Sequence, residues 1–109
     1  MKHFLDEKIS SIVKNETKQF DSMSIRIECP FETGVKVECH GQRGADVFSP
    51  AIPGGVRTFF KFVEMVRKNN ATDRFNVVDI KIKSDGRYTT NFSFDDEVQR
   101  NAEENVRQD

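Results

Sequence analysis

Hydrophobic and polar residues alternate most regularly in the last third of the chain. Val78, Ile80 and Ile82 are separated by polar residues, as expected for a strand with one buried face. Asp85-Gly86 follows, and this dipeptide favours a tight turn because both residues tolerate the positive φ that a type I′ turn needs. The pattern predicts a β-hairpin. Its returning strand repeats the alternation at Tyr88, Thr90, Phe92 and Phe94.

A second region alternates in the same way nearer the N-terminus. Every second residue from Met23 to Cys29 is apolar, and Pro30 then ends the strand. Val35, Val37 and Cys39 alternate again, which predicts a first hairpin with one buried and one solvated face. The region from Gly41 to Gly55 is rich in turn residues, and Ala45 to Phe48 within it is predicted as a short third strand.

Three segments show helical spacing instead. Residues 3–18 place apolar side chains on one side of a helix, and residues 56–68 carry a wider apolar stripe that predicts the best-buried helix. A last helix follows Asp95, which is expected to cap its N-terminus, with Asp96 and Glu97 in the first turn. Its apolar stripe is thin, so we expect weak docking. That stripe consists of Val98, Ala102 and Val106.

Together these elements define a fold class. Their order is α-ββ(β)-α-ββ-α, and hairpins separated by helices favour an antiparallel or mixed sheet with helices packed on one face. A chain of 109 residues has room for one core, so residues 1–109 are expected to form a single α+β domain.

Acidic residues are concentrated at the C-terminal end. Residues 95–109 carry six acidic and two basic side chains, a net charge of −4, whereas residues 1–94 carry 15 basic and 12 acidic ones, a net charge of +3. The chain as a whole has a formal net charge of −1 and lacks the broad basic character typical of nucleic-acid binding. The distribution predicts a mildly basic body with an acidic terminal helix, which is either simply solvated or binds a partner.

The N-terminal region predicts a cytoplasmic protein. Asp6 and Glu7 interrupt any apolar run, so a secretory signal is not expected, and no stretch approaches the ~18 apolar residues of a membrane span. Cys29 and Cys39 are the only cysteines, and in the first hairpin they fall about four residues out of register, roughly 13 Å along the strand. Because a disulfide needs Cα atoms within ~7 Å, we expect two buried free thiols.

One short motif suggests an enzyme. Asp79-Ile80-Lys81 matches the acidic-x-Lys fragment of restriction-type nucleases, in which carboxylates hold Mg²⁺ and the lysine steadies the transition state. Asp46 or Asp73 would have to supply a second carboxylate. An amphipathic strand with charges on its outer face produces the same three residues by chance, which we regard as the better interpretation.

Cysteine and histidine chemistry is also weakly supported. Cys39 and His40 are adjacent, with Cys29 upstream, but structural zinc needs four ligands and His3 belongs to a distant helix. Neighbouring strand residues point to opposite faces, so the His40 imidazole is not expected to activate the Cys39 thiol. Core thiols and one exposed histidine are the preferred interpretation.

Two glycine-rich segments resemble phosphate-binding loops. Gly41-Gln42-Arg43-Gly44 has the GxxG spacing of KH RNA-binding modules, and Gly54-Gly55 precedes a helix. The first follows a strand instead of lying between helices, and the second lacks the Lys-Ser/Thr of a P-loop. Both are predicted to be turn glycines.

The second hairpin and the start of the acidic helix also resemble a known family. Ile80-Lys81-Ile82, Asp85-Gly86 and Phe92-Ser93-Phe94-Asp95-Asp96 are similar to the C-terminal signature of the YezG-like immunity proteins, which are small bacterial antitoxins. The close likeness covers about a fifth of the chain, and the order of elements resembles the family over nearly all of it.

This resemblance implies a function without catalysis. It implies a cytoplasmic immunity protein that binds and neutralises a cognate toxin of bacterial competition, such as contact-dependent growth inhibition, the toxin being expected to be a nuclease. No catalytic residue, metal, cofactor, membrane or direct nucleic-acid contact is expected. From the charge pattern, the expected toxin contacts are Asp95, Asp96, Glu97, Glu103 and Glu104, with Asp85 at the hairpin tip.

Two other functions remain open. The first is a small nucleic-acid-binding or Mg²⁺-dependent nuclease domain that uses Asp79 and Lys81, or the loop around Arg43. The second is a homodimer that pairs through an exposed edge strand.

Overall fold

The order of elements predicted from the sequence is confirmed. The computed structural model describes residues 2–16, 19–31, 34–52, 54–69 and 74–107, and within these residues three helices and five strands form. In chain order they are α1 (Lys2–Asn15), β1 (Ser22–Glu28), β2 (Lys36–Arg43), β3 (Asp46–Phe48), α2 (Arg57–Asn69), β4 (Val77–Lys83), β5 (Tyr88–Ser93) and α3 (Asp96–Arg107).

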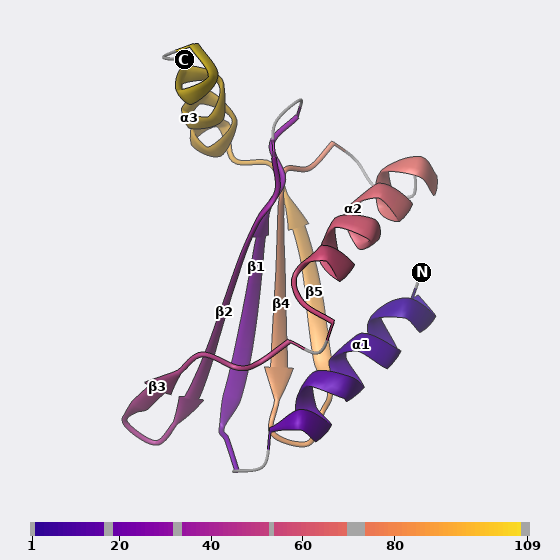
Figure 1. The fold of residues 1–109 in the computed structure, drawn as a ribbon, viewed down its shortest axis with the longest axis vertical. Coiled ribbons are helices and arrows are strands. Elements are labelled where there is room, and N and C mark those ends of the chain that lie inside the picture. Colours follow the sequence, from indigo (N-terminus) through magenta and orange to yellow (C-terminus); the bar gives the residue numbers. More distant parts are fainter. Residues whose placement is uncertain (1, 17–18, 32–33, 53, 70–73, 108–109) are drawn as a thin grey trace.

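The strands form one antiparallel sheet in the order β3-β2-β1-β4-β5 (Figure 1). Both predicted hairpins are present, β1–β2 and β4–β5, and β3 pairs with the end of β2. The chain crosses from β3 through α2 to β4, which then pairs with β1 in the centre of the sheet. All strand pairs are antiparallel, and the fold is an α+β domain as expected.

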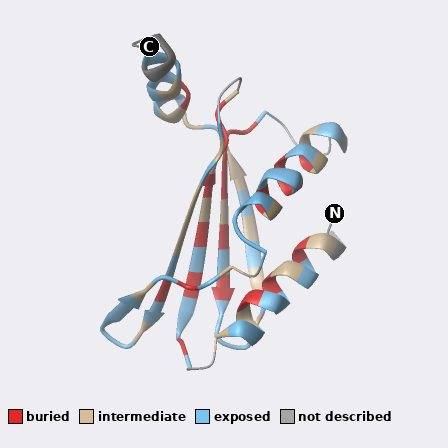
Figure 2. Cartoon of the chain, viewed as in Figure 1, coloured by how far each residue is buried: buried red, intermediate tan, exposed pale blue. Residues whose placement is uncertain are grey.

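The core lies between this sheet and helices α1 and α2, which cover one of its faces (Figures 1 and 2). Alternate residues of the two central strands point into it, so Ile25 and Ile80 are almost fully buried. Burying an aliphatic or aromatic side chain of this size contributes roughly 1.5–3 kcal/mol each. The largest fully buried apolar side chains are Phe59, Phe62, Ile9, Ile12, Ile25, Ile27, Ile80, Ile82, Val66, Val77 and Val78.

The opposite face of the sheet is polar. In the described part of the chain no helix covers it, and the residues that alternate with the core positions are exposed or half-buried, except Val77 at the start of β4, which is buried. Arg26 contacts two carboxylates there, Asp79 at 3.5 Å on β4 and Glu28 at 3.3 Å on its own strand. Surface ion pairs of this kind contribute about 0–1 kcal/mol each, so this face stabilises the fold weakly.

The structure corrects the prediction of a loop beginning at Gly41. β2 continues to Arg43, and Gly41 pairs with both β1 and β3. Gly41 is a strand residue that leaves room for a ring, because a Cβ there would lie 2.2 Å from the ring of Phe48. The interpretation of Gly41 as a turn glycine was therefore wrong. Gly44 is the turn residue, with a φ of 61° that glycine adopts easily.

Helix α3 occupies a different place from the other two helices. It stands beyond the end of the sheet, at the opposite end of the molecule from the β4–β5 turn, and does not pack on the face covered by α1 and α2 (Figure 1). Helix α1 ends at Asn15, before the expected end at Lys18, which lies outside the described residues. Among the described helices, none has the length and apolar content needed to cross a bilayer.

Candidate functional site

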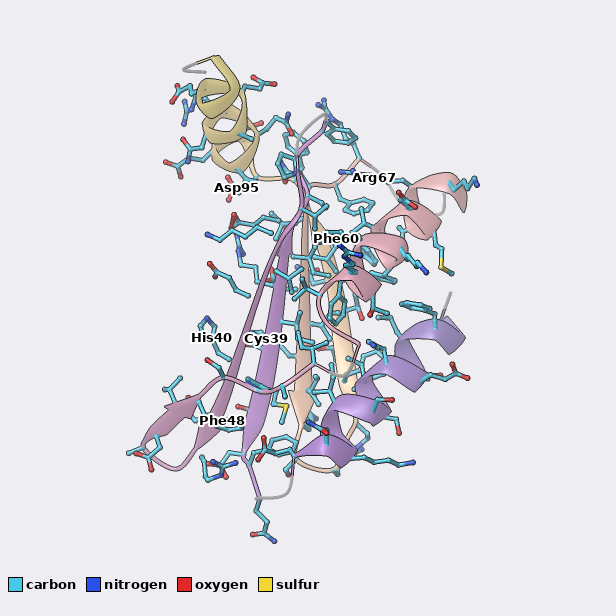
Figure 3. All side chains as sticks on the ribbon, viewed as in Figure 1. Cys39, His40, Phe48, Phe60, Arg67 and Asp95 are labelled. Atoms are coloured by element: carbon cyan, nitrogen blue, oxygen red, sulfur yellow. The ribbon has the colours of Figure 1, made fainter. Side chains whose placement is uncertain are left out.

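Asp95 caps helix α3, as the sequence predicts. Its Oδ1 accepts hydrogen bonds from the backbone N–H groups of Glu97 at 2.9 Å and Val98 at 3.3 Å. These N–H groups have no partner within the first turn of a helix, and an N-cap carboxylate satisfies them while its charge interacts favourably with the helix dipole. Asp95 lies at the base of α3 (Figure 3), where one carboxylate oxygen is directed at its own helix.

Asn76 fixes the position of this cap. Its side chain is fully buried and forms two hydrogen bonds with the backbone of Asp95. Nδ2 donates to the Asp95 carbonyl at 2.9 Å, and Oδ1 accepts from the Asp95 N–H at 2.8 Å. The chain entering α3 is therefore attached to the residue that precedes β4.

Gln99 attaches the next turn of α3 to the connection between β1 and β2. Its Oε1 accepts from the Phe31 N–H at 2.8 Å, and its Nε2 donates to the Phe31 carbonyl at 3.2 Å. The side chain is 9% exposed, so both bonds are shielded from water. Two such amide-to-backbone pairs, at Asn76 and Gln99, attach α3 to the body through polar groups more than through its thin apolar stripe.

Two arginines stack around Phe31 at the same end of the sheet. The guanidinium of Arg67 lies 4.3 Å from the Phe31 ring centre, and Nη2 donates to the carbonyls of Cys29 at 2.5 Å and Phe75 at 3.2 Å. Arg74 lies between the rings of Phe31, at 4.8 Å, and Phe94, at 4.6 Å. Arg67 reaches this cluster from α2 (Figure 3), at a position where the apolar stripe of the helix continues. The sequence analysis did not predict this cluster of Phe31, Arg67 and Arg74.

The exposed carboxylates of α3 form a surface that we call the acidic surface of α3. It consists of Asp96, Glu97, Glu103 and Glu104, all of which are exposed. Glu103 also accepts from Gln99 Nε2 at 3.3 Å, which connects this surface to the buried attachment below it. The structure thus brings together four of the residues that the sequence predicts as toxin contacts, with Asp95 beneath them as the cap.

Asp85 lies apart from this surface. It is in the β4–β5 turn, at the other end of the sheet (Figure 1), and its carboxylate accepts from Arg87 Nε at 2.7 Å and from the Arg87 N–H at 3.0 Å. These hydrogen bonds from Arg87 lower the pKa of Asp85. Asp85 and the acidic surface of α3 therefore do not belong to one contact surface.

The residues suggested for a nuclease do not converge. Asp79 and Lys81 lie on the polar face of β4, where Arg26 holds the Asp79 carboxylate at 3.5 Å. Asp46 on β3 is opposite Arg43 on β2, and side chains at these positions lie on the face of the sheet that the helices cover. Asp73 is outside the described residues. Among the described residues, no group of three or more His, Cys, Asp or Glu side chains is placed to hold a metal ion.

The thiols are free, and the register between them is the predicted one. Cys39 is opposite Ile25, four residues from Cys29, and both are unpaired. Cys29 is buried as expected, whereas Cys39 is only half-buried. Burial raises the pKa of the Cys39 thiol to about 11, so it is protonated at neutral pH. His40 is exposed, and Figure 3 shows it on the other side of β2 from Cys39.

Neither glycine-rich segment forms an open phosphate loop. Arg43 is held by three groups: its guanidinium lies 4.2 Å from the Phe48 ring centre, its Nη2 is 3.0 Å from Glu16, and its Nε donates to the Gln19 carbonyl at 2.6 Å. Gly54 and Gly55 have positive φ and precede α2, as the prediction of turn glycines requires.

A separate apolar groove runs along β5. It has a volume of about 610 Å³ and lies on the side of the sheet that carries the helices. Tyr88 is at one end, where its hydroxyl donates to Asp6 Oδ1 at 2.5 Å. Burial and this carboxylate together raise the pKa of Tyr88 to about 12. The groove is lined by Leu5, Asp6, Phe62, Gly86, Arg87, Tyr88, Thr90 and Phe92.

The titration of Tyr88 is expected to reach its midpoint near pH 12 in the folded protein. Because its pKa rises from 10.0 on folding, Tyr88 stabilises the fold below pH 10.0, and this contribution is lost as the pH rises through 12. Tyr88 is the only tyrosine and the chain has no tryptophan, so phenolate absorbance reports this residue alone. Asp6→Asn should lower the midpoint while leaving it above 10.0, since burial is the larger cause. A midpoint of 10.0 while circular dichroism shows a folded chain would contradict this assignment.

No protein-family model matches the chain. No curated protein matches it either.

Proposed function

We propose that this protein is a cytoplasmic immunity protein that binds and neutralises a cognate toxin, a nuclease, through the acidic surface of α3. The resemblance to the YezG-like family supports the immunity role and a toxin as the partner. The observation that carries it is the placement of α3: an acidic helix held beyond the sheet on a buried polar attachment, with four exposed carboxylates.

The negative charge of such a helix suits a cationic partner. A nuclease needs a cationic cleft to hold phosphates, and exposed carboxylates pair with the same cationic groups. Complementary charge accelerates association and excludes partners of the wrong sign. The attachment through Asn76 and Gln99 adds rigidity, which reduces the ordering cost of binding. Inhibition of this kind requires no catalytic residue in the inhibitor.

The alternative, a nuclease that uses Asp79 and Lys81, receives less support. The Asp79 carboxylate already contacts Arg26, so a cationic side chain lies where the metal would have to bind. Mg²⁺-dependent cleavage by the purified protein, lost in Asp79→Ala, would favour this alternative over the immunity function.

The first test is to identify the partner. The protein is used as bait in a lysate of the organism that encodes it, and bound proteins are identified by mass spectrometry. We expect one stoichiometric partner, encoded next to this protein and lethal to a bacterial host unless both are expressed. No specific partner, in cells that express the neighbouring genes, would contradict the proposal.

Reversing charge on α3 is expected to weaken that complex. Glu103→Lys together with Glu104→Lys should lower the affinity for the partner by about tenfold or more, roughly 1.4 kcal/mol, and should reduce its dependence on salt. Both residues are exposed, and the only hydrogen bond described for them that the variant removes is the one from Gln99 Nε2 to Glu103. Because Gln99 keeps both of its bonds to Phe31, the fold should be unchanged.

The matched control reverses the same number of charges elsewhere. Asp46→Lys together with Glu64→Lys changes exposed residues on β3 and α2. Affinity and salt dependence are measured by calorimetry for both variants. Equal losses in the two would show an effect of net charge only, and a loss in the control alone would place the contact away from α3.

A further inference from the structure

Strand β5 forms one edge of the sheet, and its sequence lacks the features that usually protect an edge. In the described part of the chain no strand pairs with its outer side. Its six residues, Tyr88–Ser93, contain no charge, no proline and no glycine. Edge strands with none of these features pair readily with another strand.

The other edge of the sheet is protected. β3 has only three residues, and it covers β2 over Gly41–Arg43. The uncovered part of β2 carries Lys36, Glu38 and His40, and Lys36 pairs with Glu38 at 3.1 Å. The contrast between a charged edge and an uncharged one indicates that β5 is suited to pairing.

The hydrogen bonds of the second hairpin determine which backbone groups of β5 are free. The Lys83 N–H donates to the Arg87 carbonyl at 2.7 Å, and the Asn76 N–H donates to the Ser93 carbonyl at 3.0 Å. Residues 87 and 93 thus face β4, and residues 89 and 91 do so with them, because bonding alternates along an antiparallel pair. The backbone groups of Tyr88, Thr90 and Phe92 point outward.

We propose that β5 pairs with β5 of a second copy of this chain, in antiparallel orientation, with Thr90 on the two-fold axis. Only residues that point outward form hydrogen-bonded pairs, so Thr90 is opposite Thr90 and Tyr88 is opposite Phe92 of the other copy. Each of these pairs exchanges two backbone hydrogen bonds. The two sheets become one continuous sheet.

The side chains of β5 favour a second copy of this chain as the pairing partner. Tyr88, Thr90 and Phe92 line the apolar groove of about 610 Å³ described above, and in this register an aromatic ring from each copy is opposite one from the other. Aromatic cross-strand pairs contribute roughly 0.2–1 kcal/mol each. Arg87 of one copy is placed opposite the uncharged Ser93 of the other, and its guanidinium is already paired with Asp85 of its own turn, so like charges do not meet there. The surface is self-complementary, whereas a strand of another protein would have to supply this pattern independently.

The proposal does not depend on the proposed function, and it is tested with the full chain. Sedimentation velocity over a range of concentrations should give a species of twice the 12.6 kDa chain mass. Thr90→Pro removes one outward N–H without removing a bond to β4, and should give the monomer mass. Thr90→Val keeps the N–H and the branched shape, and should give the dimer mass. A wild-type chain that remains at 12.6 kDa at all concentrations, or a Thr90→Pro variant that dimerises as wild type does, overturns the proposal.

A second measurement needs no variant. Amide hydrogen exchange should show protection at Tyr88, Thr90 and Phe92 that rises with protein concentration, and protection at Thr89 and Asn91 that does not change. Fast exchange of the outward amides at every concentration overturns the dimer. Protection that appears only when another protein is added would assign the edge to a strand of that protein instead.

Discussion

Replacing Phe62 by alanine is expected to lower the free energy of unfolding by about 3–5 kcal/mol. Phe62 is 1% exposed, and its ring centre lies 6.3 Å from those of both Phe4 on α1 and Phe92 on β5. The ring therefore joins two helices and an edge strand. Its removal leaves a cavity that these three elements, attached to one another elsewhere, close only in part.

The matched control lies two residues away on the same helix. Phe60 is 37% exposed, so Phe60→Ala removes an identical side chain with a smaller loss of buried surface and leaves no enclosed cavity, and it should cost about 1–2 kcal/mol. Urea denaturation followed by circular dichroism gives both values. Similar losses in the two variants would show that Phe62 is not in the core of the protein in solution.

Replacing Asn76 by leucine is expected to lower the free energy of unfolding by about 2–4 kcal/mol, and to release α3. Leucine has a similar size but cannot bond the Asp95 N–H or carbonyl, and a buried polar group without a partner costs about 1–3 kcal/mol. Because water can reach these groups if the start of α3 detaches, we expect the helix to open before the sheet unfolds.

The control is Asn91→Leu, the same substitution at an exposed residue of β5. Amide hydrogen exchange is measured on both variants, together with urea denaturation. In Asn76→Leu the amides of α3 should exchange faster while those of β1 and β4 remain protected. Unchanged protection of α3 would mean that Gln99 and the aromatic cluster hold the helix without Asn76.

The pattern of residues along the chain was enough to predict the elements and the face that each one buries. Alternation at Met23, Ile25 and Ile27 and at Ile80 and Ile82 identified two strands that the structure places in the centre of the sheet. Local chemistry was equally reliable at Asp95, because an N-cap depends only on residues within one turn. Periodicity and capping are properties of neighbouring residues, and for that reason the chain displays them directly.

The contacts between distant residues could be known only from the folded chain. It separated Asp85 from α3, although the two are close in sequence, because β5 carries the chain from one end of the sheet to the other. It brought Arg67, Asn76 and Gln99 to one end of the sheet, through bonds to backbone groups that no side-chain pattern marks. It also left β5 at the edge, since strand order depends on the crossing through α2. Burial leaves a periodic pattern in the sequence, whereas the pairing of distant segments does not.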